Sequence, residues 1–158
     1  TGEVMGIDST FLSAFAKSQI ACGTILPSKG KVFISVDDDN KKFILAIANK
    51  LLNLDFSIVA TKGTSKFLSN NNLKVETINK VKEGGPHIVD AIIANKINLV
   101  INTTKTQGSI RDSYSIRRTA LTYNIPYYTT IAGAKIAVDT IEHLKKNSLK
   151  VNSLQDLI

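Results

Sequence analysis

The sequence of 158 residues contains no tryptophan, a single cysteine and only 6% aromatic residues. One cysteine, Cys22, cannot form an internal disulfide, which disfavours a disulfide-rich secreted miniprotein. The shortage of aromatic side chains disfavours a module that stacks single-stranded nucleic acid. No apolar run approaches the roughly 20 residues that span a bilayer, and the N-terminus lacks the basic-then-apolar order of a signal peptide. We therefore expect a soluble, cytoplasmic protein without a membrane partner.

Basic residues exceed acidic ones, with 20 Lys and Arg against 13 Asp and Glu and a formal charge of +7. Only three of the basic residues are arginines, and all three lie within residues 111–118. Scattered lysines are typical of a solvated surface. No recognised DNA-binding pattern accompanies the arginines. We expect no nucleic-acid partner, and a basic nucleic-acid-binding module remains an alternative.

The length and the 43% hydrophobic content predict one globular domain, with or without an appendage. After Ser9, a good N-cap, apolar residues recur at helical spacing as far as the stop signal Gly23. An irregular stretch, 25–30, follows, so we place a boundary near residue 24. Because the sequence begins at Thr1 without an initiator, we expect it to be a piece of a longer protein.

From residue 31 onward, short apolar strands alternate with amphipathic helices. The expected strands cover 31–36, 56–60, 74–78, 98–101 and 127–130. The expected helices begin after Asp37–Asn40 and at Ser65, Pro86, Ser113 and Gly133. Apolar strands, each followed by a helix, predict a three-layer α/β fold with a five-stranded parallel sheet of Rossmann type. Ligands bind such folds outside the carboxyl ends of the strands.

Polar residues at those strand ends indicate phosphate binding. Thr61–Thr64, with the sequence Thr-Lys-Gly-Thr, leaves a strand and enters a helix, where backbone N–H groups converge on anions. This segment is not a Walker loop, and a plain turn is an equally good interpretation of it alone. Lys41, Lys80 and Asn102–Thr104 add donors at the same edge of the sheet.

Other polar residues have simpler interpretations. Asp37–Asp39 lacks the glycine and terminal glutamate of a calcium loop, so a solvated helix start is expected. Neither histidine, His87 nor His143, has a partner at metal-ligand spacing, and Cys22 is expected to be a packed small residue. Asp112 or Ser113 is a plausible helix cap. One turn later, Arg117 is either part of an exposed basic helix face or a ligand contact.

Seven motifs in order are similar to the C-terminal end of the large subunit of carbamoyl-phosphate synthetase. They are Thr1–Gly6, Phe15–Gln19, Ala60–Thr64, Asn79–Val81, Gly85–Ile88, Ile101–Thr104 and Arg111–Leu121. The resemblance implies that residues 1–23 are the tail of the preceding ATP-grasp domain and a linker. It also implies that residues 24–158 form an allosteric domain of the methylglyoxal-synthase-like type, which has no catalytic centre of its own.

Effector residues follow from the same resemblance, which implies binding of a nucleoside monophosphate, with UMP as inhibitor and IMP as activator. The matching phosphate positions are Lys41, Thr61, Thr64, Lys80, Asn102 and Thr104, with Lys62 as an added cation. Asp112 and Ser113 match positions near the nucleoside, with Arg117 close by, and Tyr127 and Thr129 match positions that help to bind ornithine. No metal ligand is implied in this segment.

The parent enzyme implied by the resemblance is an ATP-dependent ligase that makes carbamoyl phosphate from bicarbonate, glutamine-derived ammonia and two ATP. Its ATP, magnesium or manganese, and potassium belong to the ATP-grasp parts, and this segment has no cofactor. The implied partners are the rest of the large subunit, a glutaminase small subunit and further copies in an oligomer. The alternative within the same superfamily is a methylglyoxal synthase. That enzyme needs a carboxylate base and a histidine where this sequence has Pro86 and Arg111.

Overall fold

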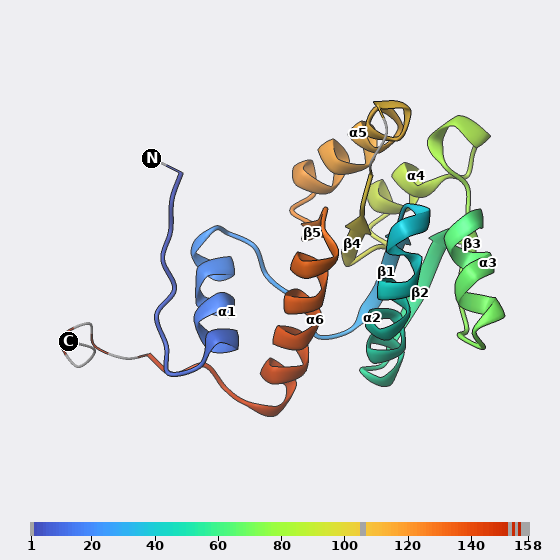
Figure 1. Cartoon of the computed structure of the whole chain (residues 1–158). Helices are drawn as coiled ribbons and strands as arrows, with labels where there is room; N and C mark the ends of the chain where they lie inside the picture. Colours follow the sequence, from blue (N-terminus) through green and yellow to red (C-terminus); the bar gives the residue numbers. More distant parts are fainter. Residues whose placement is uncertain (1, 105–106, 152, 154, 156–158) are drawn as a thin grey trace.

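Strands and helices alternate along the chain in the computed structural model, which describes residues 2–104, 107–151, 153 and 155. For residues 107–112 only the backbone is described. The strands are β1 (Gly30–Ser35), β2 (Phe56–Thr61), β3 (Glu76–Ile78), β4 (Leu99–Asn102) and β5 (Tyr127–Tyr128). The helices are α1 (Phe11–Ala21), α2 (Lys41–Asn53), α3 (Lys62–Asn70), α4 (Ile88–Ile93), α5 (Gln107–Thr122) and α6 (Ile131–Lys146), with 3₁₀ turns η1 (Asp38–Asn40) and η2 (Val81–Glu83) (Figure 1).

The five strands form one parallel sheet in the order β3-β2-β1-β4-β5, which confirms the predicted α/β fold. β1 pairs with β2 on one edge and with β4 on the other. The chain builds β1, β2 and β3 outward in one direction and then returns to place β4 on the free edge of β1. The strand order therefore reverses between β1 and β4, where parallel sheets bind their ligands.

Helices cover both faces of the sheet (Figure 1). Val32 and Ile34 of β1 are fully buried in the cluster that includes side chains of α2, α3 and α6. Phe33, between them, is fully buried in the opposite cluster with α4 and α5. Successive side chains of a strand point to opposite faces, so a run of apolar residues requires cover on both sides.

Several boundaries differ from the sequence prediction. Thr10, not Ser9, caps α1, because the Thr10 side chain accepts a hydrogen bond from the Ser13 N–H. Pro86 does not open a helix, because it precedes His87, the N-cap of α4. Thr61–Thr64 is not a loop, since α3 begins directly at Lys62.

The predicted start of the fifth helix at Ser113 is also wrong. α5 begins at Gln107, so Asp112 and Ser113 lie inside the helix and neither is its cap. The helix thereby begins six residues before the predicted start.

α1 packs beside α6 (Figure 1). The Ser13 hydroxyl and His143 Nε2 are 2.9 Å apart, and the Tyr128 hydroxyl donates to Gln19 Oε1 at 3.0 Å. Burial raises the pKa of Tyr128 to about 12. The segment before residue 24 is thus attached to the sheet domain, and the proposed boundary stays a prediction. Among the described residues, none of the helices has the length and apolar character required to cross a membrane.

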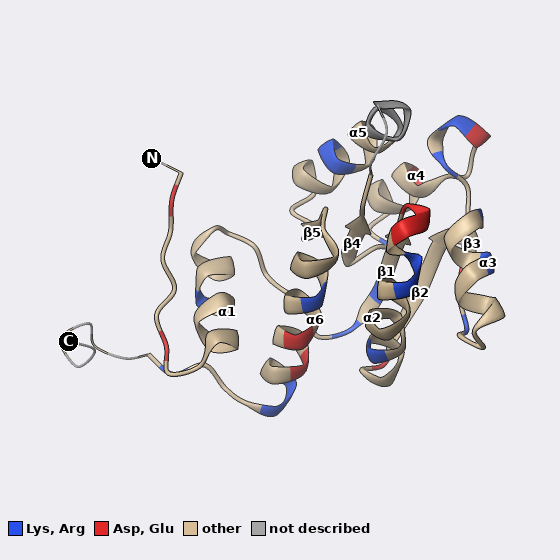
Figure 2. Cartoon of the chain, viewed as in Figure 1, with Lys and Arg blue, Asp and Glu red and all other residues tan. Residues whose placement is uncertain are grey.

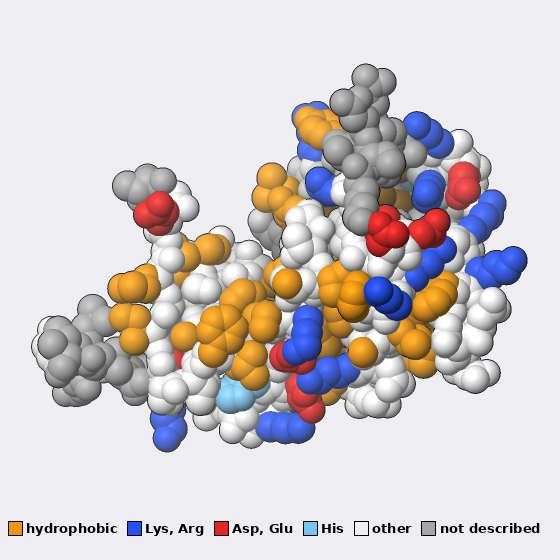
Figure 3. Space-filling view, in the orientation of Figure 1, with side chains coloured by type: hydrophobic (Ala, Val, Ile, Leu, Met, Phe, Trp, Pro, Cys, Tyr) orange, Lys and Arg blue, Asp and Glu red, His pale blue; other side chains and the backbone are white. Residues whose placement is uncertain are grey.

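Ion pairs join α2 to α6 on the outer surface. Lys50 Nζ lies 2.7 Å from Asp139 and 2.5 Å from Glu142, and Lys135 Nζ lies 2.8 Å from Asp139. Beside them is an apolar groove of about 490 Å³ that includes the half-exposed ring of Phe43 (Figure 3). Partial burial raises the pKa of Asp139, but hydrogen bonds from Lys135 and Lys50 outweigh it and hold that pKa below its usual value.

Truncation of a central strand residue should be strongly destabilising. Ile101→Ala removes a fully buried side chain of β4, and we expect a loss of about 2–5 kcal/mol in the free energy of unfolding. Ile93→Ala on α4 is the matched control, because the Ile93 side chain is 51% exposed. Urea denaturation of both variants tests this, and equal losses would contradict the assignment of the core.

The α2–α6 ion pairs should make stability depend on pH. A carboxyl group with a lowered pKa in the folded state contributes stability above its unfolded pKa and loses that contribution as the pH falls through the folded value. We therefore expect Asp139→Asn to unfold more easily than the wild type at pH 7. The difference should shrink below about pH 4. Melting curves at several pH values measure it, and a difference that is constant with pH would exclude the ion pairs as its cause.

Candidate anion-binding site

A small cavity of about 100 Å³ lies at the carboxyl ends of β1, β2 and β4, where the strand order reverses. It is lined by Ser35, Val36, Asp37, Thr61, Lys80, Asn102, Thr103, Thr104, Ser113 and Ile116. Six of these residues were singled out from the sequence: Thr61, Lys80, Asn102, Thr103, Thr104 and Ser113. They come from four segments that are far apart along the chain, and parallel strand ends bring them together.

Asn102 places a buried hydrogen-bond donor at the cavity. Its side chain is only 2% exposed, and its Nδ2 has no hydrogen-bond partner among the described residues. Its Oδ1 accepts a long hydrogen bond from the Ser113 hydroxyl at 3.4 Å, which leaves the amide group as a donor. A buried donor without an acceptor costs about 1–3 kcal/mol, and an anion in the cavity would relieve that cost.

The start of α3 provides further donors beside Asn102. Thr61 is the N-cap of α3 and is almost fully buried, but its side chain does not cap the helix. Its hydroxyl instead donates to Ser35 Oγ at 3.2 Å. The first N–H groups of α3 therefore receive no acceptor from the Thr61 side chain, and together with the helix dipole they favour an anion.

Thr64 has a structural role that the sequence did not indicate. Its buried hydroxyl accepts a hydrogen bond from the Val36 N–H at 3.2 Å, beyond the end of β1. This bond ties α3 to the loop after β1. Thr64 is absent from the cavity lining, unlike the other threonine of the Thr-Lys-Gly-Thr segment.

The three predicted lysines lie around the cavity in different ways. Lys80 lines it. Lys41 Nζ pairs with Asp38 at 2.7 Å, yet it lies over the start of α3, since a Cβ placed on Gly63 would be 3.7 Å from it. Lys62 is mostly exposed and lies 3.8 Å from Glu83. Lys41 is therefore close to the helix terminus, whereas Lys62 points toward an acidic partner.

Arg117 contacts the cavity wall through Thr104. Its Nη2 donates to Thr104 Oγ1 at 2.8 Å, and its buried Nε has no partner among the described residues. Of the two interpretations that the sequence left open, the structure favours an inward-facing arginine over an exposed basic face. Arg118, the next residue, is exposed.

Sequence reasoning missed Ser35, Val36, Asp37 and Ile116 as lining residues. The expectation that Asp37 is merely a solvated helix start is wrong. Its carboxylate caps η1 and accepts hydrogen bonds from Thr103 Oγ1 at 2.9 Å and Asn40 Nδ2 at 2.6 Å. Asp37 stands two residues after the end of β1, which places it at the edge where β2 ends at Thr61, whereas its bond to Thr103 is not visible in the sequence.

The remaining predicted residues lie elsewhere. Tyr127 lines a separate cavity of about 150 Å³ between the end of α1 and β5, and Thr129 is exposed between β5 and α6. The side chain of Asp112 lies outside the described residues. Cys22 is exposed rather than packed, because it ends α1 at the surface.

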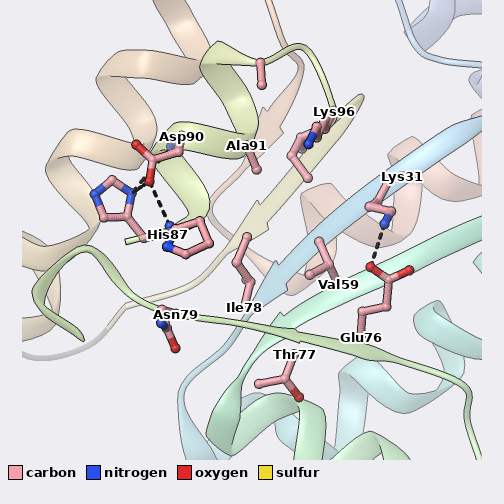
Figure 4. A pocket seen from close by; sticks show the side chains of 13 residues that line it. Lys31, Val59, Glu76, Thr77, Ile78, Asn79, His87, Asp90, Ala91 and Lys96 are labelled. Carbon is pink, nitrogen blue, oxygen red and sulfur yellow. Dashed lines mark hydrogen bonds and ion pairs between the residues drawn. The ribbon is translucent and has the colours of Figure 1, made fainter. Parts of the chain in front are cut away.

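A larger cavity of about 550 Å³ lies between α4 and the β3 edge (Figure 4). Its floor is apolar, and several of the charged groups on its wall are already engaged. Lys31 contacts Glu76 at 2.6 Å, and Asp90 accepts from the His87 N–H at 2.9 Å. No buried polar atom without a partner was found there among the described residues, so the smaller cavity is the candidate site.

The site does not resemble a metal centre. In the part of the chain that the structure describes, no three His, Cys, Asp or Glu side chains are grouped so as to hold a metal ion. Asp37 and Asp38 are instead engaged with Thr103 and Lys41. Hydrogen-bond donors outnumber carboxylates in the cavity wall, which is the chemistry of anion binding.

The chain is similar to known proteins in sequence and in fold. The family profile described as MGS-like domain matches residues 43–129. The chain belongs to the MGS-like domain family. The solved structure of methylglyoxal synthase from Elizabethkingia anophelis NUHP1 superposes with a TM-score of 0.59 over 72% of this chain and 79% of that one. At 16% identity this likeness shows the fold alone.

Several similar sequences are carbamoyl phosphate synthase large chains. The one from Myxococcus xanthus is 48% identical over 158 residues, which is 100% of this chain and 15% of the relative. The one from Brucella suis is 49% identical over 156 residues, which is 99% of this chain and 13% of the relative. The C-terminal section from Methanopyrus kandleri is 48% identical over 158 residues, which is 99% of this chain and 29% of the relative. The chain thus spans less than a third of the length of each.

The structural role of Thr64 can be tested by substitution. Thr64→Val keeps the shape of the side chain but leaves the Val36 N–H without its acceptor, so we expect a loss of about 1–3 kcal/mol in the free energy of unfolding. Thr64→Ser restores the hydroxyl and should recover most of that stability. Chemical denaturation of both variants measures the effect, and equal stability of the two would contradict the role.

Proposed function

We propose that this MGS-like domain is the regulatory part of a carbamoyl phosphate synthase large chain and binds a nucleoside monophosphate. The observation that carries the proposal is the buried, unpartnered Asn102 amide in a cavity that also contains Lys80 and Thr61. The identity of 48% to synthase large chains over the whole length of this chain supports the choice of parent enzyme. That enzyme would use ATP, magnesium or manganese, and potassium in its other parts.

The ligand phosphate would bind between the start of α3 and the end of β4. Lys80, Asn102 and the first N–H groups of α3 would donate to it, with Thr61 lining the wall and Lys41 approaching from the first turn of α2. Charge-assisted hydrogen bonds of about 1.5–3 kcal/mol each make a few such donors sufficient for micromolar binding. A cavity of about 100 Å³ is too small for a whole nucleotide, so the nucleoside would extend past Thr104 and Ser113.

Effector identity follows from resemblance, with UMP as inhibitor and IMP as activator. Regulation requires different affinities of the effector for two states of the enzyme, with a typical coupling of about 1–3 kcal/mol. The rest of the large subunit would be the direct partner, and the glutaminase small subunit and further copies in an oligomer would be reached through it. Tyr127 and Thr129, near the contact with α1, would help to bind ornithine.

Binding rather than catalysis is the function that the cavity supports. The carboxylate of Asp37, in the cavity wall, accepts hydrogen bonds from Asn40 and Thr103. These bonds give Asp37 a structural role in the wall rather than the role of a base that abstracts a proton. Formation of methylglyoxal from dihydroxyacetone phosphate by the purified chain would overturn this assignment.

Calorimetric titration with UMP and IMP tests the proposed site. Lys80→Ala removes a cation from the cavity wall, and we expect it to weaken binding about ten- to hundredfold. Lys29→Ala is the matched control, because Lys29 is exposed at the opposite, amino end of β1 and its loss changes the net charge equally. Regulation is then measured separately, as the effect of UMP on the activity of the complete enzyme with and without Lys80→Ala.

Two results would count against the proposal. One is a folded wild-type chain that binds neither nucleotide. The other is equal binding by the Lys80→Ala variant and the wild type. Tight binding of duplex or single-stranded oligonucleotides that UMP does not compete with would favour the basic nucleic-acid-binding alternative.

A further inference from the structure

Helix α5 contacts the end of β4 through two polar side chains that are one turn apart. Ser113 and Arg117 lie on the same face of the helix, because residues four positions apart are neighbours there. The Ser113 hydroxyl donates to Asn102 Oδ1 at 3.4 Å, and Arg117 Nη2 donates to Thr104 Oγ1 at 2.8 Å. Asn102 and Thr104 both line the cavity. One face of α5 therefore engages an oxygen of each of two residues in the cavity wall.

These two bonds determine what each wall residue can still offer to a ligand. A guanidinium group has only donors and does not lose its proton, so Thr104 Oγ1 must be the acceptor. The bond from Arg117 is the only one that Thr104 Oγ1 makes with the described residues, so its single hydrogen is available for donation. Asn102 is arranged in the same way, since its Oδ1 is engaged while its Nδ2 has no partner in the described part of the chain.

Arg117 also brings a positive charge to this wall. Within the described residues its half-buried guanidinium forms no ion pair, and its buried Nε has no hydrogen-bond partner. The part of α5 whose side chains are described, 113–122, contains two arginines and no acidic residue (Figure 2). A partly buried cation without a counter-charge is costly, and an anion bound in the adjacent cavity would reduce that cost.

We propose that Arg117 is a positioning residue for the ligand phosphate and acts through Thr104. It holds Thr104 Oγ1 as an acceptor, so that the hydroxyl hydrogen is left for an anion in the cavity. The positive charge behind the oxygen makes the hydroxyl a stronger donor. The inference rests on the proposed function, because it concerns the same cavity. It gives Arg117 a role in binding that needs no direct contact with the ligand.

A double-mutant cycle on UMP binding, measured by calorimetry, tests this route. Arg117→Met keeps an unbranched side chain and removes the charge and the donors, so we expect UMP to bind about tenfold more weakly. Thr104→Val keeps the shape of the side chain and removes the hydroxyl. In the Thr104→Val background, Arg117→Met should weaken binding by no more than about twofold, because the hydroxyl through which Arg117 acts is already absent.

The matched control is Arg118→Met. Arg118 is the next residue of α5, its side chain is exposed, and its loss changes the net charge equally. This variant should bind UMP within about twofold of the wild type. Arg117→Lys keeps the charge and can still donate one hydrogen bond to Thr104, so it should recover part of the affinity that Arg117→Met loses.

Folding stability separates this role from a purely structural one. Because Arg117 keeps a buried nitrogen without a described partner, Arg117→Met should leave the urea midpoint of the unliganded chain unchanged or raise it. A structural role would lower that midpoint and would weaken UMP binding by the same factor in both backgrounds. That pair of results would overturn the inference.

Two further results would also overturn it. One is wild-type affinity for UMP in the Arg117→Met variant. The other is equal binding of UMP by Thr104→Val and by Thr104→Ser, since only the serine variant keeps the hydroxyl. If Arg117→Met fails to fold, Arg117→Gln takes its place in the cycle, and the two Thr104 variants decide independently of it. A wild-type chain that binds neither UMP nor IMP contradicts the proposed function itself, so the two failures are distinguishable.

Discussion

Strand β1 is the element on which the rest of the structure depends. It is hydrogen-bonded to a neighbour on both edges, and Val32, Phe33 and Ile34 are fully buried on its two faces. A strand with no free edge and no free face can neither shift register nor tilt without breaking contacts on every side. Its carboxyl end is therefore a fixed point. The strand order reverses there, which opens the space that the candidate site occupies.

Some polar groups near the carboxyl end of β1 hydrogen-bond to other protein groups and fix the cavity wall. Others have no partner in the described part of the protein and are available to a ligand. The loop after β1 is hydrogen-bonded to the side chains of Thr64, Thr103 and Asn40. Asn102 and Arg117 keep buried nitrogens without partners among the described residues. Because buried polar groups are normally satisfied, a rigid wall next to unsatisfied donors is typical of a site prepared for binding. The rigidity also means that little ordering of the protein opposes binding.

The sequence predicted the sheet well because its signals are local and strong. Each central strand is an apolar run followed by turn or cap residues, and Thr61, Lys80 and Asn102 could be placed at one edge from that pattern alone. The start of α5 was placed too late, because the polar stretch 102–112 lacks the apolar periodicity that indicates a helix. Asp37 was misjudged for a different reason. Its partner Thr103 lies 66 positions away, and only the pairing of β1 with β4 brings the two together.

Strand pairing also bears on how, under the proposed function, an occupied site would influence the segment before the sheet. Tyr128, whose hydroxyl binds Gln19 of α1, is in register with Ile101, the residue before Asn102. The candidate site and the contact with α1 are thus separated by one residue along β4 and one strand pairing. Such adjacency produces coupling only if an element has two arrangements that the ligand favours differently. β5 is two residues long and pairs with β4 alone, so among the strands it has few backbone hydrogen bonds to exchange. A displacement of the end of β4 would be transmitted to α1 through β5 more easily than through β1, because β1 is paired on both edges and covered on both faces.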